Sequence, residues 1–126
     1  MPIARVLVIE DNPMNMELSI DLLRVQGHEV LAARTADEAL SLLQQVIPDL
    51  ILMDIQLPGL SGLDLTKRLR EDGRTKAVPI IAITAYAMMG DAEKAFEAGC
   101  DGYIPKPINF QQFAQVVEDV LRRRGE

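Results

Sequence analysis

Five short apolar runs recur along the chain and alternate with longer amphipathic segments. The runs are rich in β-branched or aliphatic residues and span 3–9, 29–32, 50–53, 78–83 and 102–104. The first, third and fourth show no polar alternation, which is typical of strands buried on both faces of a parallel sheet. The pattern therefore predicts five strands.

The segment after the first run carries the signals of a helix. Pro13 follows Asn12 and suits a first-turn position, and Gly27 is a natural stop. Apolar residues recur at helical spacing, and we expect this helix to face the core with Met14, Leu18, Leu22 and Val25.

Four further helices are predicted, each with its own start signal. Thr35 and Glu38 have capping-box spacing, and Ser61 precedes a helix that we expect to bury Leu65 and Leu69. The last two helices are expected to begin near Asp91, with Ala92, Ala95 and Phe96 on the apolar face, and at Asn109, with Phe113, Val116, Val117 and Val120.

The strand-helix rhythm indicates an α/β fold with an open sheet. Five such units in 126 residues are too few for a closed eight-stranded barrel. The commonest five-stranded parallel sheet has the order 2-1-3-4-5 and is doubly wound with helices on both faces. In such sheets, ligands bind beyond the carboxyl ends of the strands, between strands 1 and 3.

Length and charge narrow the possible functions. We expect residues 1–126 to form one domain with no output domain. The net charge of -6 disfavours binding to nucleic acid or to an anionic membrane. The single cysteine and the absence of a signal-peptide pattern at the start predict a cytoplasmic location. The run Arg122 to Arg124 fits either a helix dipole or a basic docking site.

Polar side chains gather at the predicted carboxyl ends of the strands. They are Glu10 and Asp11 after the first strand, Asp54 after the third, Thr84 after the fourth and Lys106 after the fifth. Carboxylates this close repel one another unless a proton or a cation joins them. Oxygen ligands with open positions suit Mg²⁺, which binds one or two carboxylates together with phosphate oxygens.

This combination of groups also suits phosphoryl transfer. Asp54 can act as a nucleophile that forms an aspartyl-phosphate, while Lys106 and Thr84 can interact with the phosphoryl oxygens. A cap or another structural role would explain any one of these acids, but it explains all of them together poorly.

The set Glu10-Asp11, Asp54, Thr84 and Lys106-Pro107 resembles the signature of response-regulator receiver domains, the CheY-like (flavodoxin-like) family of two-component signalling. The resemblance covers the whole chain. The stretches 8–12, 53–58 and 84–88 are also similar to stand-alone DivK-type receivers and to the receivers of hybrid kinases.

The resemblance implies a role for each residue. Asp54 would accept phosphate from a histidine kinase or phosphotransfer protein, and Glu10 and Asp11 would hold Mg²⁺ with the backbone carbonyl of Gln56. Thr84 and Tyr103 match the family's switch pair, and the Lys106-Pro107 bond is expected to be cis. Many members have Asp where this chain has Glu10, which lengthens the reach to the metal.

Two finer expectations concern the lifetime of the phosphate and the output. Gln56 and Tyr86 each lie two positions beyond a functional residue, where they would either modulate acyl-phosphate lifetime or simply border the site. Output is expected on the face formed by the fourth helix, the fifth strand and the last helix. That face would bind another protein or a second copy, so the chain would be a monomer or a weak dimer.

Two other function classes remain open from the residues. Phosphatases of the haloacid-dehalogenase type also phosphorylate an aspartate, but they place a second Asp where this chain has Gln56. A flavin or nucleotide carrier would need a phosphate-binding loop after the first strand, where the acidic pair would repel phosphate.

Overall fold

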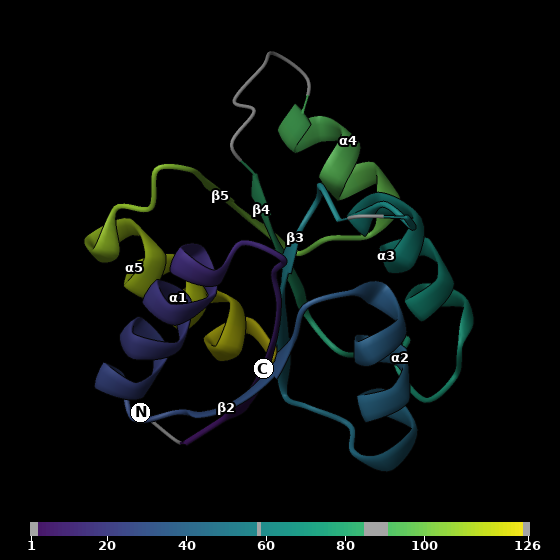
Figure 1. Ribbon diagram of the computed structural model, residues 1–126, viewed down its shortest axis with the longest axis horizontal. Coiled ribbons are helices and arrows are strands. Elements are labelled where there is room, and N and C mark those ends of the chain that lie inside the picture. The colour runs from purple at the N-terminus through teal and green to yellow at the C-terminus, as the bar shows by residue number, and fades with distance from the viewer. Residues whose placement is uncertain (1–2, 58, 85–90, 125–126) are drawn as a thin grey trace.

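A computed structural model of the chain describes residues 3–57, 59–84 and 91–124, which form one sheet with helices on both faces (Figure 1). The strands are β1 (Arg5–Ile9), β2 (Glu29–Ala33), β3 (Leu50–Asp54), β4 (Ile80–Thr84) and β5 (Gly102–Pro105). All neighbouring strands are parallel, in the order β2-β1-β3-β4-β5. The predicted strands and their order are confirmed, with ends that differ by one or two residues.

The helices divide between the two faces of the sheet. Figure 1 shows α1 (Pro13–Val25) and α5 (Phe110–Arg124) on one face, and α2 (Ala36–Gln45), α3 (Gly62–Glu71) and α4 (Asp91–Ala98) on the other. None of the described helices combines the length and the apolar character needed to cross a membrane.

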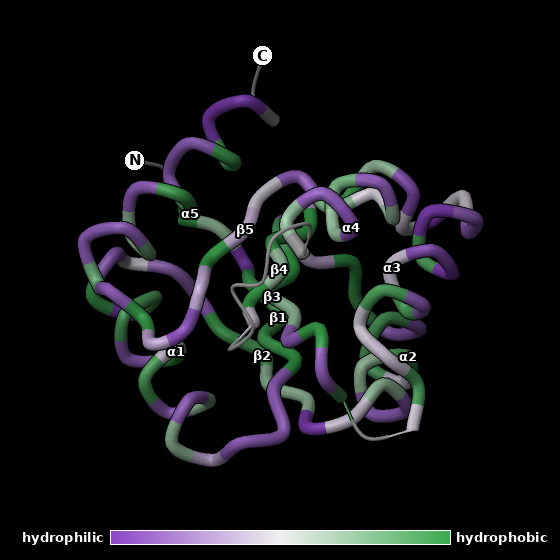
Figure 2. The backbone as a smooth tube through the Cα atoms, turned by 90° about the horizontal axis from the view of Figure 1, so that it is seen from above, coloured by the Kyte–Doolittle hydropathy of each residue, from purple (hydrophilic) through white to green (hydrophobic). Residues whose placement is uncertain are grey.

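Alternate residues of each central strand supply two separate cores. Leu7, Ile51 and Ile80 pack towards α2 and α3, whereas Val6, Leu52 and Ile81 pack towards α1 and α5. Figure 2 shows the central strands as the hydrophobic middle of the molecule. This two-sided burial explains why the strand sequences are nearly continuous apolar runs.

Side-chain caps begin the helices as their sequences predict. Asn12 Oδ1 accepts from the amides of Met14 and Asn15, at 3.0 and 3.1 Å, and caps the amino end of α1. Thr35, Ser61 and Asn109 cap α2, α3 and α5 in the same way. A cap of this kind contributes about 1 kcal/mol, and the caps of α1, α3 and α5 lie at the ends of the loops that follow β1, β3 and β5.

The expected core face of α1 is wrong. Met14, Leu18 and Val25 are 80%, 40% and 85% exposed, and only Leu22 of the expected stripe packs partly against the core. The buried residues are instead Met16, Ser19 and Leu23, which lie on another face of the helix. The helix has apolar residues around much of its circumference, so its periodicity alone does not select the buried face.

Phe96 of α4 is a second correction. It is 49% exposed, whereas Ala95 of the same predicted face is fully buried. Ala95 packs into the core on the α2 and α3 side of the sheet, whereas the side chain of Phe96 remains about half in solvent. The buried residues predicted for α3 and α5 are confirmed, although Val116 is only partly buried.

Candidate functional site

Three carboxylates meet at the carboxyl edge of the sheet. Glu10 directly follows β1, and Asp54 is the last residue of β3, the strand that pairs with β1. Glu10, Asp11 and Asp54 each offer an oxygen that lies within 4.8 Å of the others. Glu10 and Asp54 are buried, while Asp11 is exposed. The structure therefore brings the three predicted acids together around one point that is open to solvent on the Asp11 side.

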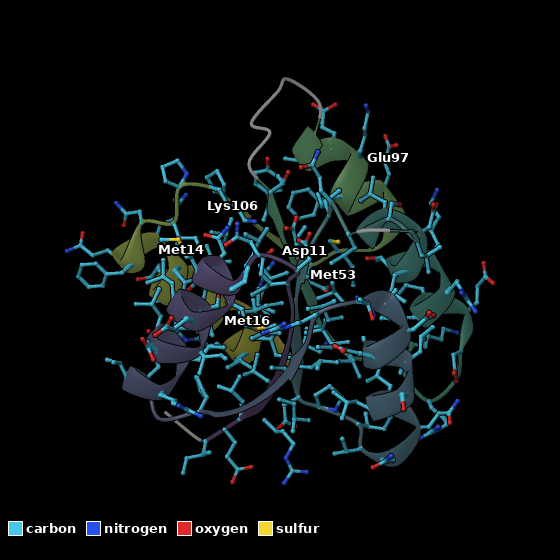
Figure 3. The ribbon with its side chains drawn as sticks, viewed as in Figure 1. Asp11, Met14, Met16, Met53, Glu97 and Lys106 are labelled. Carbon is cyan, nitrogen blue, oxygen red and sulfur yellow. The ribbon has the colours of Figure 1, made fainter. Side chains whose placement is uncertain are left out.

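The ammonium group of Lys106 lies between the two buried acids. Its Nζ donates to Asp54 Oδ2 at 3.0 Å and lies 2.8 Å from Glu10 Oε1. The Lys106–Pro107 peptide bond is cis, as the family resemblance implies. Figure 3 labels Lys106 and Asp11 at this edge of the molecule. The sequence placed Lys106 at the site, but it did not predict that one ammonium bridges both acids.

Main-chain hydrogen bonds hold the Asp54 carboxylate and the residue that follows it. The Gln56 amide donates to Asp54 Oδ1 at 2.9 Å, and the Gly62 amide donates to the Ile55 carbonyl at 2.7 Å. A Cβ on Gly62 would lie 2.5 Å from the Asp54 carbonyl oxygen and 2.7 Å from the Ile55 Cα. Since those atoms are backbone, only glycine lets α3 approach the end of β3 this closely. Gly62 is therefore a positioning residue, and its role was not predicted from the sequence.

The crowded acids change the protonation of the site. Burial, reinforced by a hydrogen bond with Asp54, raises the pKa of Glu10 to about 7. Burial alone would lower the pKa of Lys106, but its hydrogen bonds with Glu10 and Asp54 outweigh burial and raise that pKa. Near neutral pH the site thus keeps its ammonium, and Glu10 is close to its midpoint of protonation. A cation that binds here competes with the proton on Glu10.

This protonation predicts a pH dependence of stability in the metal-free protein. The pKa of Glu10 rises from 4.5 to about 7 on folding, so between these values the folded chain binds more protons than the unfolded chain. Its stabilising effect is complete below the lower value and is lost as pH rises through the upper one. As the pH rises from below 4.5 to above about 7 with a chelator present, the free energy of unfolding should fall by up to about 3 kcal/mol more in the parent than in Glu10→Gln.

Urea unfolding of both proteins across this pH range checks the expected difference. Glu17→Gln, a change of the same kind at an exposed position of α1, should keep the pH profile of the parent. Identical profiles for the parent and Glu10→Gln would contradict the assigned protonation.

The remaining predicted site residues lie around this group. Thr84 is buried at the end of β4, and its carbonyl accepts from the Lys106 amide at 2.7 Å. Tyr103 is partly buried on β5 and packs against the core on the α2 and α3 side. Gln56 is exposed beside Asp54. Tyr86 lies outside the described residues.

The sequence matches a family model and curated relatives. The model for the response regulator receiver domain covers residues 6–118. The polar-differentiation response regulator DivK of Brucella ovis is 46% identical over 116 residues, which cover 92% of this chain and 94% of that protein. DivK of Brucella abortus matches to the same extent.

Solved structures agree with the sequence matches. A putative response regulator from Chloroflexus aurantiacus has a TM-score of 0.92 and 32% identity, covering 96% of this chain and 99% of that one. The receiver domain of the sensor histidine kinase PA1611 from Pseudomonas aeruginosa has a TM-score of 0.86 and 32% identity, covering 95% and 98%. That structure holds a magnesium ion coordinated in its active site cleft.

Proposed function

The chain belongs to the response regulator receiver domain family of two-component signalling, and from that membership we propose that Asp54 is its phosphoryl acceptor. Receiver domains bind Mg²⁺ at an acidic site and interact with histidine kinases and phosphotransfer proteins. Members of this family are signalling modules, whereas the residues alone also allowed a phosphatase or a flavin or nucleotide carrier. The observation that carries the proposal is the convergence of Glu10, Asp11 and Asp54 on one point beside Lys106.

The proposed reaction is a single phosphoryl transfer. An oxygen of the Asp54 carboxylate attacks the phosphorus of a phosphohistidine on the donor protein. The phosphorus–nitrogen bond breaks, its electron pair stays on the histidine ring, and an acyl phosphate forms on Asp54. The Gln56 amide supports this step because its bond to Asp54 Oδ1 orients the attacking carboxylate, while Gly62 lets α3 pack against the main chain at the end of β3.

The donor set fits Mg²⁺. Carboxylate oxygens of Glu10, Asp11 and Asp54 are hard ligands, and we propose that the Gln56 carbonyl completes the protein's share of the shell. The longer Glu10 side chain would take part directly or through water. When bound, the ion neutralises charge on the acids and on the incoming phosphoryl group.

Lys106 and Thr84 are proposed to hold the phosphoryl group once it is attached. Lys106 already donates to Asp54 Oδ2, so a small movement brings its ammonium to an oxygen of a phosphoryl group on that carboxylate. The hydroxyl of Thr84, on the neighbouring strand, can donate to a second oxygen. Gln56 and Tyr86 are proposed to border the path of the water that later hydrolyses the acyl phosphate.

The output is proposed to lie on the face formed by α4, β5 and α5. In the described part of the sheet β5 is an outer strand. It contains Tyr103 and ends one residue before Lys106. The Lys106 amide donates to the Thr84 carbonyl. Movement of either residue towards a phosphoryl group therefore pulls on the main chain of the other residue. Phosphorylation would thereby shift the population of two arrangements of this face, which binds a protein partner.

Acetyl phosphate tests the proposed metal-assisted chemistry. With Mg²⁺, the protein should gain one acid-stable, base-labile phosphoryl group, seen by intact-mass spectrometry, and with a chelator it should gain none. Glu10→Gln and Asp11→Asn should each weaken Mg²⁺ binding by at least about tenfold, because each removes a charge from the cation site. Glu17→Gln is the matched control. Unchanged Mg²⁺ affinity in both site variants would refute this assignment.

A further inference from the structure

A cavity lies at the edge of the sheet opposite Asp54. Its volume is about 710 Å³, and its lining residues lie just before β3, β4 and β5 and at the ends of α3 and α5. Since all strands are parallel, this amino edge is as far from the acidic site as the sheet allows. The volume is in the range of small-molecule binding sites, roughly 300–1,000 Å³.

The charge of this cavity is opposite to that of the whole chain. The protein has a net charge of -6, yet four cations line the cavity, namely Arg70, Arg74, Lys76 and Arg123. Asp101 is the one acid that the described lining contains, and its Oδ2 already accepts from Arg70 Nη2 at 2.7 Å. The cavity therefore carries an excess of positive charge, which attracts an anion.

The arginine side chains are held in place by main-chain carbonyls. Arg74 Nη2 donates to the carbonyls of Leu43 and Gln44 at the end of α2, at 3.0 and 3.3 Å. Arg123 Nη2 donates to the carbonyl of Asp101 at 3.2 Å. Carbonyls do not neutralise a guanidinium, which keeps further N–H donors for a ligand. A ligand would therefore meet cations that are already positioned, at a reduced cost in side-chain entropy.

Arg70 joins the walls of the cavity. Its Nε donates to the Gly99 carbonyl at 2.9 Å, and its Nη1 donates to the carbonyls of Lys76 and Val78 at 3.0 and 2.6 Å. One side chain thus ties the loop before β4 to the loop before β5. This leaves Lys76, which is exposed and carries a full charge on a flexible stem, as the cation best able to move onto a ligand.

The cavity also has an apolar part. Ile47, Val78, Pro79 and Val120 contribute to its lining, and Ile47 remains 39% exposed although it is aliphatic. An inorganic anion would contact only the cations and leave this surface in water. An occupant with an apolar body would cover it as well.

We propose that this cavity binds an organic phosphate, an anion with more than one phosphate charge attached to an apolar body, which is the class to which nucleotides belong. Guanidinium groups match phosphate oxygens in planar, bidentate geometry, and the aliphatic lining suits the body of the ligand. The cations line one concave space, which favours a compact ligand over an extended acidic peptide. The site is separate from Asp54 and does not depend on phosphorylation.

Titration with ATP in the presence of a chelator tests this proposal, because the chelator excludes Mg²⁺-dependent binding at the acidic site. Backbone amide signals of residues 74–79 and 99–101 should shift with a dissociation constant below about 1 mM. Inorganic phosphate should bind at least about tenfold more weakly, since it cannot cover the apolar lining. The Asp54→Asn variant should bind ATP like the parent.

Two variants and one control locate the binding. Lys76→Glu should weaken ATP binding by at least about tenfold, because it replaces an attractive charge with a repulsive one. Ile47→Gln should weaken ATP binding while leaving inorganic phosphate unchanged. Arg68→Glu, an equal charge change at an exposed position of α3 outside the lining, should stay within about twofold of the parent.

Several results would overturn the proposal. They are ATP-induced amide shifts confined to the acidic edge, equal losses of ATP affinity in Lys76→Glu and Arg68→Glu, or tighter binding of a poly-glutamate peptide than of ATP. A folded Lys76→Glu protein, verified by its amide spectrum, that bound ATP with the affinity of the parent would also overturn it.

Discussion

An Asp54→Asn chain is expected to gain at least about a hundredfold less phosphate than the parent from acetyl phosphate and Mg²⁺. Asp54 ends the central strand β3 and is buried, with its carboxylate held between the Gln56 amide and Lys106. The amide group of asparagine keeps nearly the same shape, but it lacks the carboxylate that attacks phosphorus. The fold should remain intact, so the loss reports on chemistry.

Labelling is measured by intact-mass spectrometry beside a control, Asp64→Asn. Asp64 is exposed in the first turn of α3, and its replacement should leave labelling within about twofold of the parent. Circular dichroism and thermal unfolding verify that both variants are folded. Undiminished labelling of Asp54→Asn would mean that another group accepts the phosphate.

Replacing Lys106 with alanine should have the second largest effect, and it should separate stability, metal binding and switching. The ammonium is the described cation that bridges Glu10 and Asp54, both nearly fully buried. Without it, two buried carboxylates face each other, so the metal-free protein at about pH 8 should lose about 3 kcal/mol of stability. At about pH 5 the loss should be smaller, because Glu10 then carries a proton.

Magnesium binding should survive this substitution. Lys106 and Mg²⁺ both neutralise the same carboxylates, so removing the ammonium removes a competitor and the affinity should be no weaker than in the parent. Switching should nevertheless fail. In the parent, adding beryllofluoride should shift amide signals across α4, β5 and the start of α5, and in Lys106→Ala the shifts should stay close to Asp54.

The control for this series is Lys67→Ala, which removes an exposed ammonium from α3. It should match the parent in stability, Mg²⁺ affinity and the spread of amide shifts. A Lys106→Ala protein with the amide pattern of the parent would show that the lysine does not carry the signal to β5.

Strand positions and sheet order were predictable from the sequence because each depends on local pattern and on a small set of allowed topologies. The apolar runs at β1, β3 and β4 are too short for helices and match strands that are buried on both faces. The buried face of α1 was not predictable, since Met14 and Leu18 recur at helical spacing as regularly as Met16 and Leu23 do. Which stripe faces the sheet depends on how α1 meets α5, a contact between segments far apart in the sequence.

In the site, too, some features were predictable from the sequence and others were not. Glu10, Asp11 and Asp54 were predictable together because carboxyl ends of parallel strands share one edge. The double contact of Lys106, a lysine 96 positions beyond Glu10, depends on the path of the chain after β5. Gly62 was missed because a close approach between α3 and the end of β3 leaves no signal other than the glycine itself. The raised pKa of Glu10 likewise follows from burial, which the sequence does not report.

The most direct test of the proposed function is to locate the phosphoryl group on the protein. After treatment with acetyl phosphate and Mg²⁺, borohydride reduces an aspartyl-phosphate to homoserine, and peptide mass spectrometry then identifies the reduced residue. One reduced residue, Asp54, is expected in the parent, and none is expected when a chelator replaces Mg²⁺. Reduction at Asp11 or at any other acid, with Asp54 unmodified, would contradict it.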